Sequence, residues 1–239
     1  METLATSEGA MDVHGFVPDG ADRAPVPGVI VLQEAFGVNA HVKRVCRRIA
    51  GLGYAAFAPE LYHRSGRGVV FGYDEFAKAR PILGALTNER ILEDLRVAHS
   101  HVGRLPYVDR GRMAAWGFCM GGWAAVLAAC EMPLAAAVSF YGGGLVRARK
   151  DIAFTPLMDR LQNAGCPLLL VFGGQDPSIT PADIEAVHSR LAQCGKPHEV
   201  EIYPDGGHGF FCEDRAAYHR PTAEAAWARA AAWLAGRLS

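Results

Sequence analysis

One cysteine, Cys119, stands between two glycines in the stretch GFCMGG, where an apolar run changes from strand-like to helix-like spacing. A nucleophile on a tight strand-to-helix turn needs small residues two positions before and after it, because its backbone is strained and crowded. Gly117 and Gly121 occupy those positions. The following helix would point its N-terminus at the thiol and favour the thiolate, and Met120 would offer a backbone N–H to an oxyanion. A lone cysteine is more often small apolar filler, but this placement predicts a nucleophile elbow.

A thiol nucleophile needs a base and a group that orients the base, and two later segments supply candidates. Asp176 follows an apolar run in VFGGQDP, and His208 stands in IYPDGGHGF. Either residue alone also fits an ordinary turn. Together they follow Cys119 in the order nucleophile, acid, histidine that α/β-hydrolases use, with one helix and one strand between acid and base. We therefore predict a triad that needs no metal and no organic cofactor.

The apolar run VIVLQ ends in a fourth candidate, Glu34. The loop after this strand normally donates the second oxyanion N–H, here from Ala35. A solvated glutamate at the start of a helix is the competing interpretation of Glu34. Phe36, beside this loop, and Tyr141, at the strand end after the elbow, are predicted to line the substrate pocket.

The other eight histidines are weaker candidates, and we expect surface or structural roles for them: His14, His41, His63, His99, His101, His188, His198 and His219.

Strand-like and helix-like segments alternate along the chain, and their order must bring the candidate residues together. Dense short apolar runs predict strands at 27–33, 54–59, 112–118, 134–142, 167–173 and 198–204. Helical spacing and capping residues predict helices at 39–53, 88–102, from about 121, at 180–195 and at 222–238. This alternation predicts an α/β fold with a doubly wound, mostly parallel sheet and helices on both faces.

The boundaries follow from the same alternation. We expect residues 1–11 to form an N-terminal tail and residues 12–239 to form a single α/β domain. Residues 60–87 are the least regular stretch and are expected to cap the carboxyl edge of the sheet, where open α/β sheets bind ligands.

Composition narrows the class of partner. Half of the 239 residues are apolar, and 24 basic residues stand against 25 acidic ones with no long run of one sign. This balance gives no electrostatic footprint for nucleic acid or an anionic membrane surface, so a small-molecule partner is expected. The start of the chain lacks an export signal and no run of 18 apolar residues occurs, which predicts a cytoplasmic protein whose six scattered cysteines are free thiols.

Taken together, the segments QEAFGVN, APELYHR, GFCMGG, FYGGG, GGQDP and GGHGF resemble the dienelactone hydrolase family of α/β-hydrolases, in the family's order, from about residue 12 to the C-terminus. The resemblance implies the α/β-hydrolase fold, with Cys119 as nucleophile, His208 as its base and Asp176 as the orienting acid. It also implies that Glu34 pairs with the thiol at rest and helps to generate the thiolate once substrate displaces it.

The sequence departs from the family at one position. Dienelactone enzymes that accept a free carboxylate use an arginine four residues after the histidine, where this chain has Cys212. Arg215 or an arginine from 60–87 is a candidate to fill the gap. Without such a replacement, we expect neutral esters or lactones to be better substrates than carboxylate-bearing ones.

The leading hypothesis is a cysteine hydrolase of an ester or enol lactone that works through an acyl-enzyme on Cys119. A broader carboxylesterase or thioesterase is the nearest alternative, because fold does not fix substrate. A non-catalytic small-molecule binder or thiol sensor is the alternative from another class. The natural substrate and the oligomeric state stay open at this stage.

Overall fold

The apolar runs of the sequence become the centre of an eight-stranded sheet with the order β1-β2-β4-β3-β5-β6-β7-β8. The computed structural model describes all 239 residues. The strands are β1 (Glu2–Thr6), β2 (Gly9–Phe16), β3 (Val26–Leu32), β4 (Ala55–Pro59), β5 (Val108–Phe118), β6 (Ala136–Phe140), β7 (Leu168–Gly173) and β8 (His198–Tyr203). From β4 to β8 across the sheet all neighbours are parallel, so their carboxyl ends meet at one edge.

The first residues of the chain differ from the tail that the sequence suggested. β1 and β2 form an antiparallel hairpin, and β2 continues the sheet by pairing antiparallel with β4. Leu4, Met11 and Val13 are buried, so the hairpin adds apolar surface to the core. Between them the two strands contain glutamate, aspartate, alanine and glycine, which are depleted in strands, so the local sequence gave little strand signal.

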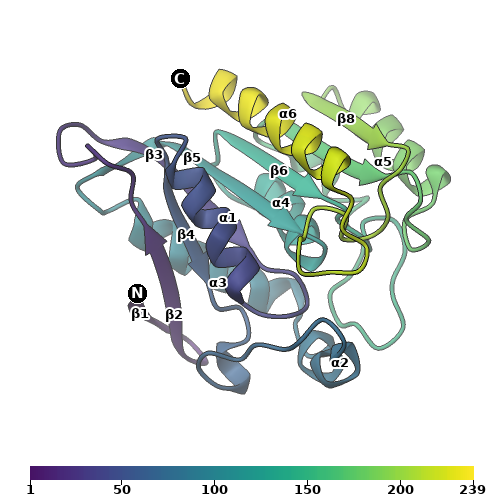
Figure 1. Ribbon diagram of the computed structural model, residues 1–239, viewed down its shortest axis with the longest axis horizontal. Helices are drawn as coiled ribbons and strands as arrows, with labels where there is room; N and C mark the ends of the chain where they lie inside the picture. Colours follow the sequence, from purple (N-terminus) through teal and green to yellow (C-terminus); the bar gives the residue numbers. More distant parts are fainter.

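Helices cover both faces of the sheet, as predicted. α1 (Ala40–Ala50) and α6 (Arg220–Leu238) lie on one face, and α3 (Asn88–Val102), α4 (Met120–Glu131) and α5 (Pro181–Gln193) lie on the other (Figure 1). The side chains of Asn39, Thr87 and Thr180 cap α1, α3 and α5 by accepting backbone N–H bonds. None of the helices combines the length and the apolar character that crossing a membrane requires.

Two less regular segments lie beyond the carboxyl ends of the strands. The segment 60–87 holds the 3-10 helix η1 (His63–Ser65) and the helix α2 (Phe76–Gly84), which stands apart from the sheet in Figure 1. Between β6 and β7 the chain forms only the short 3-10 helix η2 (Leu161–Asn163). These are the segments able to close a site over the strand ends.

The helix after the elbow, α4, is buried on all its faces. Every residue of α4 from Met120 to Cys130 is buried, so this helix has no solvent face. Trp123 packs on Phe154 with ring centroids 4.5 Å apart, and Trp116, on the strand before the elbow, stacks on Phe140. Close packing of this kind leaves little room for the turn at Cys119 to relax.

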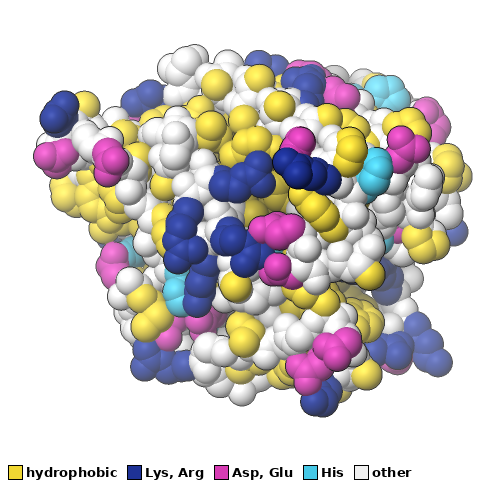
Figure 2. Space-filling view, in the orientation of Figure 1, with side chains coloured by type: hydrophobic (Ala, Val, Ile, Leu, Met, Phe, Trp, Pro, Cys, Tyr) yellow, Lys and Arg dark blue, Asp and Glu magenta, His cyan; other side chains and the backbone are white.

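The outer surface carries mixed charge. Figure 2 shows basic side chains over α1 with acidic ones beside them. Part of this group is paired, because Arg44 makes ion pairs with Glu213 and Asp214 from the loop before α6.

Candidate active site

Cys119 occupies a strained turn between β5 and α4. Its backbone has φ 54° and ψ −114°, in a region that residues with a side chain rarely adopt. A Cβ atom on Gly117 would lie 1.8 Å from the carbonyl oxygen of Gly121, and one on Gly121 would lie 2.3 Å from that of Leu32. Both glycines are therefore required by the backbone, for the reason that predicted them.

The structure brings the three predicted triad residues into contact at the carboxyl edge of the sheet. His208, in the loop after β8, places Nε2 3.1 Å from Cys119 Sγ. Its Nδ1 lies 2.6 Å from Oδ2 of Asp176, in the loop after β7. Nδ1 therefore donates to the carboxylate, and Nε2 is left to exchange a proton with the thiol.

Sequence reasoning did not identify Ser178, which fixes the acid. Its backbone N–H and its hydroxyl both donate to Oδ1 of Asp176, at 2.8 and 2.7 Å. The hydroxyl also lies 3.3 Å from Nδ1 of His208. A serine two residues after an aspartate is a common turn pattern, so the sequence signal was present without being specific.

The charges of the triad support one another. Burial alone would raise the pKa of Cys119, but the charge and the hydrogen bond of His208, with a contribution from Arg149, bring it below its ordinary value. Burial opposes the charged form of His208 as well, yet the thiolate and Asp176 raise the pKa of the imidazole. The site thus favours a thiolate and imidazolium pair.

Glu34 is buried next to this pair and is bound by Arg215. Oε1 of Glu34 accepts a hydrogen bond from Nη1 of Arg215 at 3.2 Å. The guanidinium also lies over the rings of Phe36 and Tyr73, with its carbon 5.6 and 5.7 Å from their centroids. In this structure the thiol is bonded to His208, whereas the family resemblance implied a resting pair with Glu34.

A cavity of about 220 Å³ opens at the thiol. Ala35 and Met120, the predicted oxyanion donors, line it together with Cys119. Neither backbone N–H makes a hydrogen bond within the protein, so both are free to bind an oxyanion.

The predicted substrate-binding residues lie elsewhere. Phe36, Tyr141 and Arg215 are not part of the lining of this cavity. Phe36 packs against Tyr73, and Tyr141 is fully buried behind His208 with ring centroids 5.3 Å apart. They form the layer that supports the triad and Glu34.

The remaining lining of the cavity comes from the two irregular segments. It is made of Phe76, Arg80 and Leu83 from α2 together with Gly143, Arg149, Lys150, Ile152 and Phe154 from the segment after β6. The sequence pointed to 60–87 as the cap but gave no signal for 143–154, because nothing local indicates that this segment folds back over the elbow.

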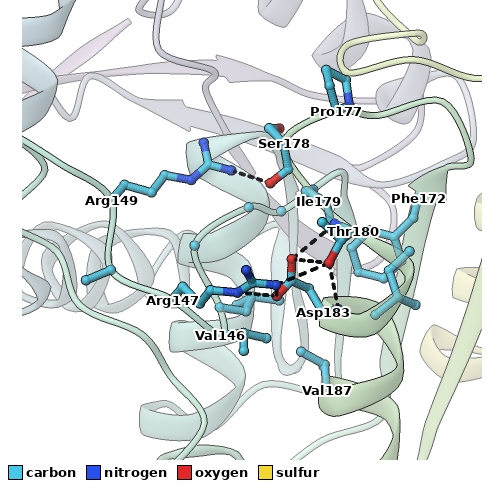
Figure 3. A pocket seen from close by; sticks show the side chains of 16 residues that line it. Val146, Arg147, Arg149, Phe172, Pro177, Ser178, Ile179, Thr180, Asp183 and Val187 are labelled. Carbon is cyan, nitrogen blue, oxygen red and sulfur yellow. Dashed lines mark hydrogen bonds and ion pairs between the residues drawn. The ribbon is translucent and has the colours of Figure 1, made fainter.

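A second cavity, of about 230 Å³, adjoins the first (Figure 3). Gly143 and Arg149 line both cavities. Figure 3 shows Arg149 donating to the backbone carbonyl of Ser178, at 3.4 Å, while Arg147 is held in an ion pair with Asp183. Arg149 thus stands between the two spaces and has no acidic partner.

Comparisons with known proteins show the family of the chain. The model of the Dienelactone hydrolase family matches residues 11–238. A Synechocystis protein named "Putative carboxymethylenebutenolidase" is 34% identical over 221 residues, which is 91% of this chain and 89% of that protein. An Escherichia coli K12 protein of the same name is 36% identical over 88% of this chain and 77% of its own length.

Solved structures give the same family. The crystal structure of a Klebsiella pneumoniae protein named "Putative Dienelactone Hydrolase" has a TM-score of 0.88 and 32% identity, over 98% of this chain and 96% of that chain. A dipeptidyl peptidase 4 from Porphyromonas gingivalis, at 18% identity and a TM-score of 0.76, shares the fold alone. The match covers 99% of this chain but only 35% of the peptidase chain. The chain belongs to the dienelactone hydrolase family and is an ester-hydrolysing enzyme with the α/β-hydrolase fold.

Proposed function

We propose that the protein hydrolyses a compact ester or enol lactone through a thioester formed on Cys119. The observation that carries this proposal is the contact of Cys119 Sγ with His208 Nε2 at 3.1 Å, on an imidazole whose other nitrogen lies 2.6 Å from Asp176. A binder or thiol sensor has no need for an acid that orients the histidine.

In the proposed reaction the Cys119 thiolate attacks the substrate carbonyl, and the N–H groups of Ala35 and Met120 stabilise the oxyanion. Collapse of the tetrahedral intermediate breaks the ester C–O bond, and the leaving oxygen takes the proton from His208 Nε2. The neutral imidazole then accepts a proton from water as its oxygen attacks the thioester. Expulsion of the thiolate releases the acid and restores the ion pair.

Glu34 is proposed as the second partner of the thiol. Pairing with Glu34 would leave a protonated, unreactive thiol. In the arrangement seen here, Glu34 is hydrogen-bonded to Arg215 and the sulfur of Cys119 is hydrogen-bonded to His208. Exchange between the two arrangements would keep the thiol protected until substrate enters.

The cavity supports a substrate that carries negative charge. No acidic residue lines it, and of its three cationic residues only Arg80 is in an ion pair, with Asp151 at 2.6 Å. Arg149 and Lys150 make no ion pair, beside an apolar wall that includes Phe76, Ile152 and Phe154. This proposal replaces the preference for neutral substrates expected from Cys212, because cations from the segment after β6 stand where the sequence indicated none.

The test of the reaction is turnover of 4-nitrophenyl acetate by the wild type and by Cys119→Ala. We expect the variant to lose turnover and the wild type to accumulate an acetyl group on Cys119, seen by mass spectrometry after rapid quenching. Cys194→Ala, which removes the other partly exposed thiol, is the matched control and should be fully active. Turnover by Cys119→Ala at the wild-type rate would refute the nucleophile.

The test of charge preference compares the 4-nitrophenyl monoester of glutarate with 4-nitrophenyl butyrate. Arg149→Gln should lower kcat/KM for the charged ester about 10-fold or more relative to the neutral one, as loss of a charge-assisted hydrogen bond does. Arg147→Gln is the control, because Asp183 already occupies that guanidinium. An unchanged ratio in Arg149→Gln would refute the anionic substrate and leave the esterase reaction standing.

A further inference from the structure

The cavity shown in Figure 3 has no part in the proposed reaction. It measures about 230 Å³ and lies between the segment after β6 and the first half of α5. It shares Gly143 and Arg149 with the catalytic cavity, which opens at Cys119. Drug-sized ligands occupy roughly 300–1,000 Å³, so only a compact molecule would fill this second cavity.

Eight consecutive residues, Gly142 to Arg149, make up one part of the lining of the second cavity. None of their backbone N–H groups donates a hydrogen bond within the protein. Gly142, Gly143 and Leu145 are nevertheless buried. Buried backbone donors are nearly always paired, so this part of the lining lacks an acceptor, which a ligand or water in the cavity would supply.

The charged side chains at the second cavity leave one cation without a partner. Asp183 is the only acid in the lining. Its carboxylate is already bound, by Arg147 at 2.6 Å and by the N–H and the hydroxyl of Thr180. Arg149 makes no ion pair and donates only to the backbone carbonyl of Ser178, at 3.4 Å (Figure 3). An unpaired positive charge beside unpaired N–H donors suits an anion.

The rest of the lining of the second cavity is largely apolar. It comes from β7 and from the loop and helix that follow, and its apolar members are Phe172, Pro177, Ile179, Ile184 and Val187. A bare inorganic anion would leave this surface in contact with water, whereas an apolar body would remove it from water. A carboxylate on a compact apolar body therefore matches both parts of the lining.

Arg149 connects the second cavity to the catalytic one. A Cβ atom on Gly143 would lie 2.1 Å from Nη2 of Arg149, so the guanidinium lies directly against the backbone of a residue that lines both cavities. Once its charge is paired with a carboxylate in one cavity, the guanidinium attracts a second carboxylate in the other much less strongly.

We propose that the second cavity binds a small carboxylate with an apolar body, and that this ligand takes Arg149 away from the catalytic cavity. The substrate preference of the enzyme then depends on the ligand, because an anionic ester loses its cation and a neutral ester does not. The effect on preference rests on the proposed role of Arg149 in substrate binding. The binding site itself does not.

The binding test uses protein whose Cys119 has been carboxamidomethylated, so that the catalytic cavity is partly filled and no turnover occurs. Benzoate is the probe, and benzamide is its neutral counterpart. We expect benzoate to shift the backbone amide NMR signals of residues 142–149 saturably, and benzamide to bind at least about 10-fold more weakly because it carries no charge for Arg149. Equal binding of the two probes, no saturable shift, or shifts confined to Ala35 and Met120 in the catalytic cavity would overturn the proposal.

Two variants locate the probe. Val146 lines the second cavity and not the catalytic one, so the ring of Val146→Phe should fill the space and abolish benzoate binding. Val97→Phe makes the same change at a half-buried position on α3 and should bind benzoate as the wild type does. If Val146→Phe does not fold, Arg149→Gln decides, since it should weaken benzoate binding about 10-fold and leave benzamide binding unchanged. Wild-type benzoate binding by Arg149→Gln would contradict the site.

The effect on preference is tested with the unmodified enzyme. Saturating benzoate should lower kcat/KM for the 4-nitrophenyl monoester of glutarate about 10-fold and change that for 4-nitrophenyl butyrate by less than about 2-fold. Equal competitive inhibition of both esters would place benzoate in the catalytic cavity and refute the proposal. The NMR titration needs no turnover, so an inactive wild type would refute the proposed function while the titration still decides whether the second cavity binds a carboxylate.

Discussion

Two histidines of this protein, His208 and His63, each hold a buried carboxylate, and only the pair of His208 belongs to the active site. His208 lies 2.6 Å from Asp176 at the carboxyl edge of the sheet, and His63 lies 3.0 Å from Asp94, between η1 and α3. The second nitrogen of His208 faces a thiol, whereas that of His63 is buried without a partner. Both regions therefore contain a histidine and carboxylate pair. What distinguishes the active-site pair is the thiol at the second ring nitrogen of its histidine.

The two carboxylates, Asp94 and Asp176, also differ in their hydrogen-bond partners. Asp94 is held by both arms of the Arg64 guanidinium, at 2.7 and 3.0 Å, which neutralises its charge. Asp176 receives only the neutral hydroxyl and amide of Ser178, so its charge remains available to an imidazolium. A buried carboxylate without a permanent cation can stabilise one that forms during a reaction, and this is the feature that marks the catalytic pair.

The largest effect should come from the imidazole itself. We expect His208→Ala to lose at least about 10⁴-fold in kcat, because the thiol loses its proton acceptor and the leaving group loses its acid. His63→Gln should keep the wild-type rate. Steady-state hydrolysis of an aryl ester measures both, and equal losses in the two variants would erase the distinction between the pairs.

Substitution of Asp176 should affect the rate, whereas substitution of Asp94 should affect stability. Asp176→Asn should fold normally and lose up to about 10⁴-fold in kcat, since the amide favours the wrong tautomer of His208. Asp94→Asn should retain its rate but lose about 3–5 kcal/mol in the free energy of unfolding, because Arg64 and His63 are left buried without their carboxylate. Urea unfolding followed by circular dichroism measures the second quantity. A stable Asp94→Asn would contradict the structural role.

The residues of the triad and some of the helices could be predicted from the sequence. Cys119, Asp176 and His208 could be predicted because each follows the carboxyl end of a strand, and parallel strands bring these ends together. The helix expected at 88–102 also has those bounds in the structure, since Thr87 caps it and Gly103 ends it. Local pattern and global fold agree at these places.

The cavity could not be predicted in this way. Arg149 and Phe154 reach the thiol only because the segment after β6 folds back over the elbow, and α2 contains Pro81, which obscured the helix in 60–87. His41 was expected to have a surface or structural role, because its helical spacing does not reveal that Glu213, from a distant part of the chain, lies 3.1 Å from its ring. Contacts between residues distant in sequence decide specificity here, and local patterns do not encode them.

The same contrast between active-site and structural residues applies to the reactivity of the cysteine thiols. Burial raises the pKa of Cys130, Cys166 and Cys212 to about 12, whereas that of Cys119 lies below its ordinary value. At pH 7 the buried thiols are therefore protonated, and Cys119 carries the largest thiolate fraction. We expect limiting iodoacetamide to label Cys119 at least about 100-fold faster than these three, by peptide mapping. Earlier labelling of a buried thiol would contradict the ion pair at the elbow.

The smallest effect should come from Ser178, the only partner of Asp176 besides His208. Burial raises the pKa of Asp176, but His208 and the two bonds from Ser178 bring it below its ordinary value. Ser178→Ala removes one of these bonds, so the pKa of Asp176 should rise, and the acid limb of kcat/KM should move to higher pH. At neutral pH the rate should fall by about 3- to 10-fold, as for one hydrogen bond to a charged group.

The control for Ser178→Ala is Ser189→Ala, which removes a hydroxyl bonded to the exposed Glu185 on α5. It should alter neither the rate nor the pH profile. Because the folded-state pKa of Asp176 is depressed, its contribution to stability is present above the unfolded-state pKa and is lost as the pH falls through the folded-state value. Ser178→Ala should therefore also begin to lose stability at a higher pH than the wild type during acid titration. A rate loss with neither pH shift would mean that Ser178 only shapes the turn.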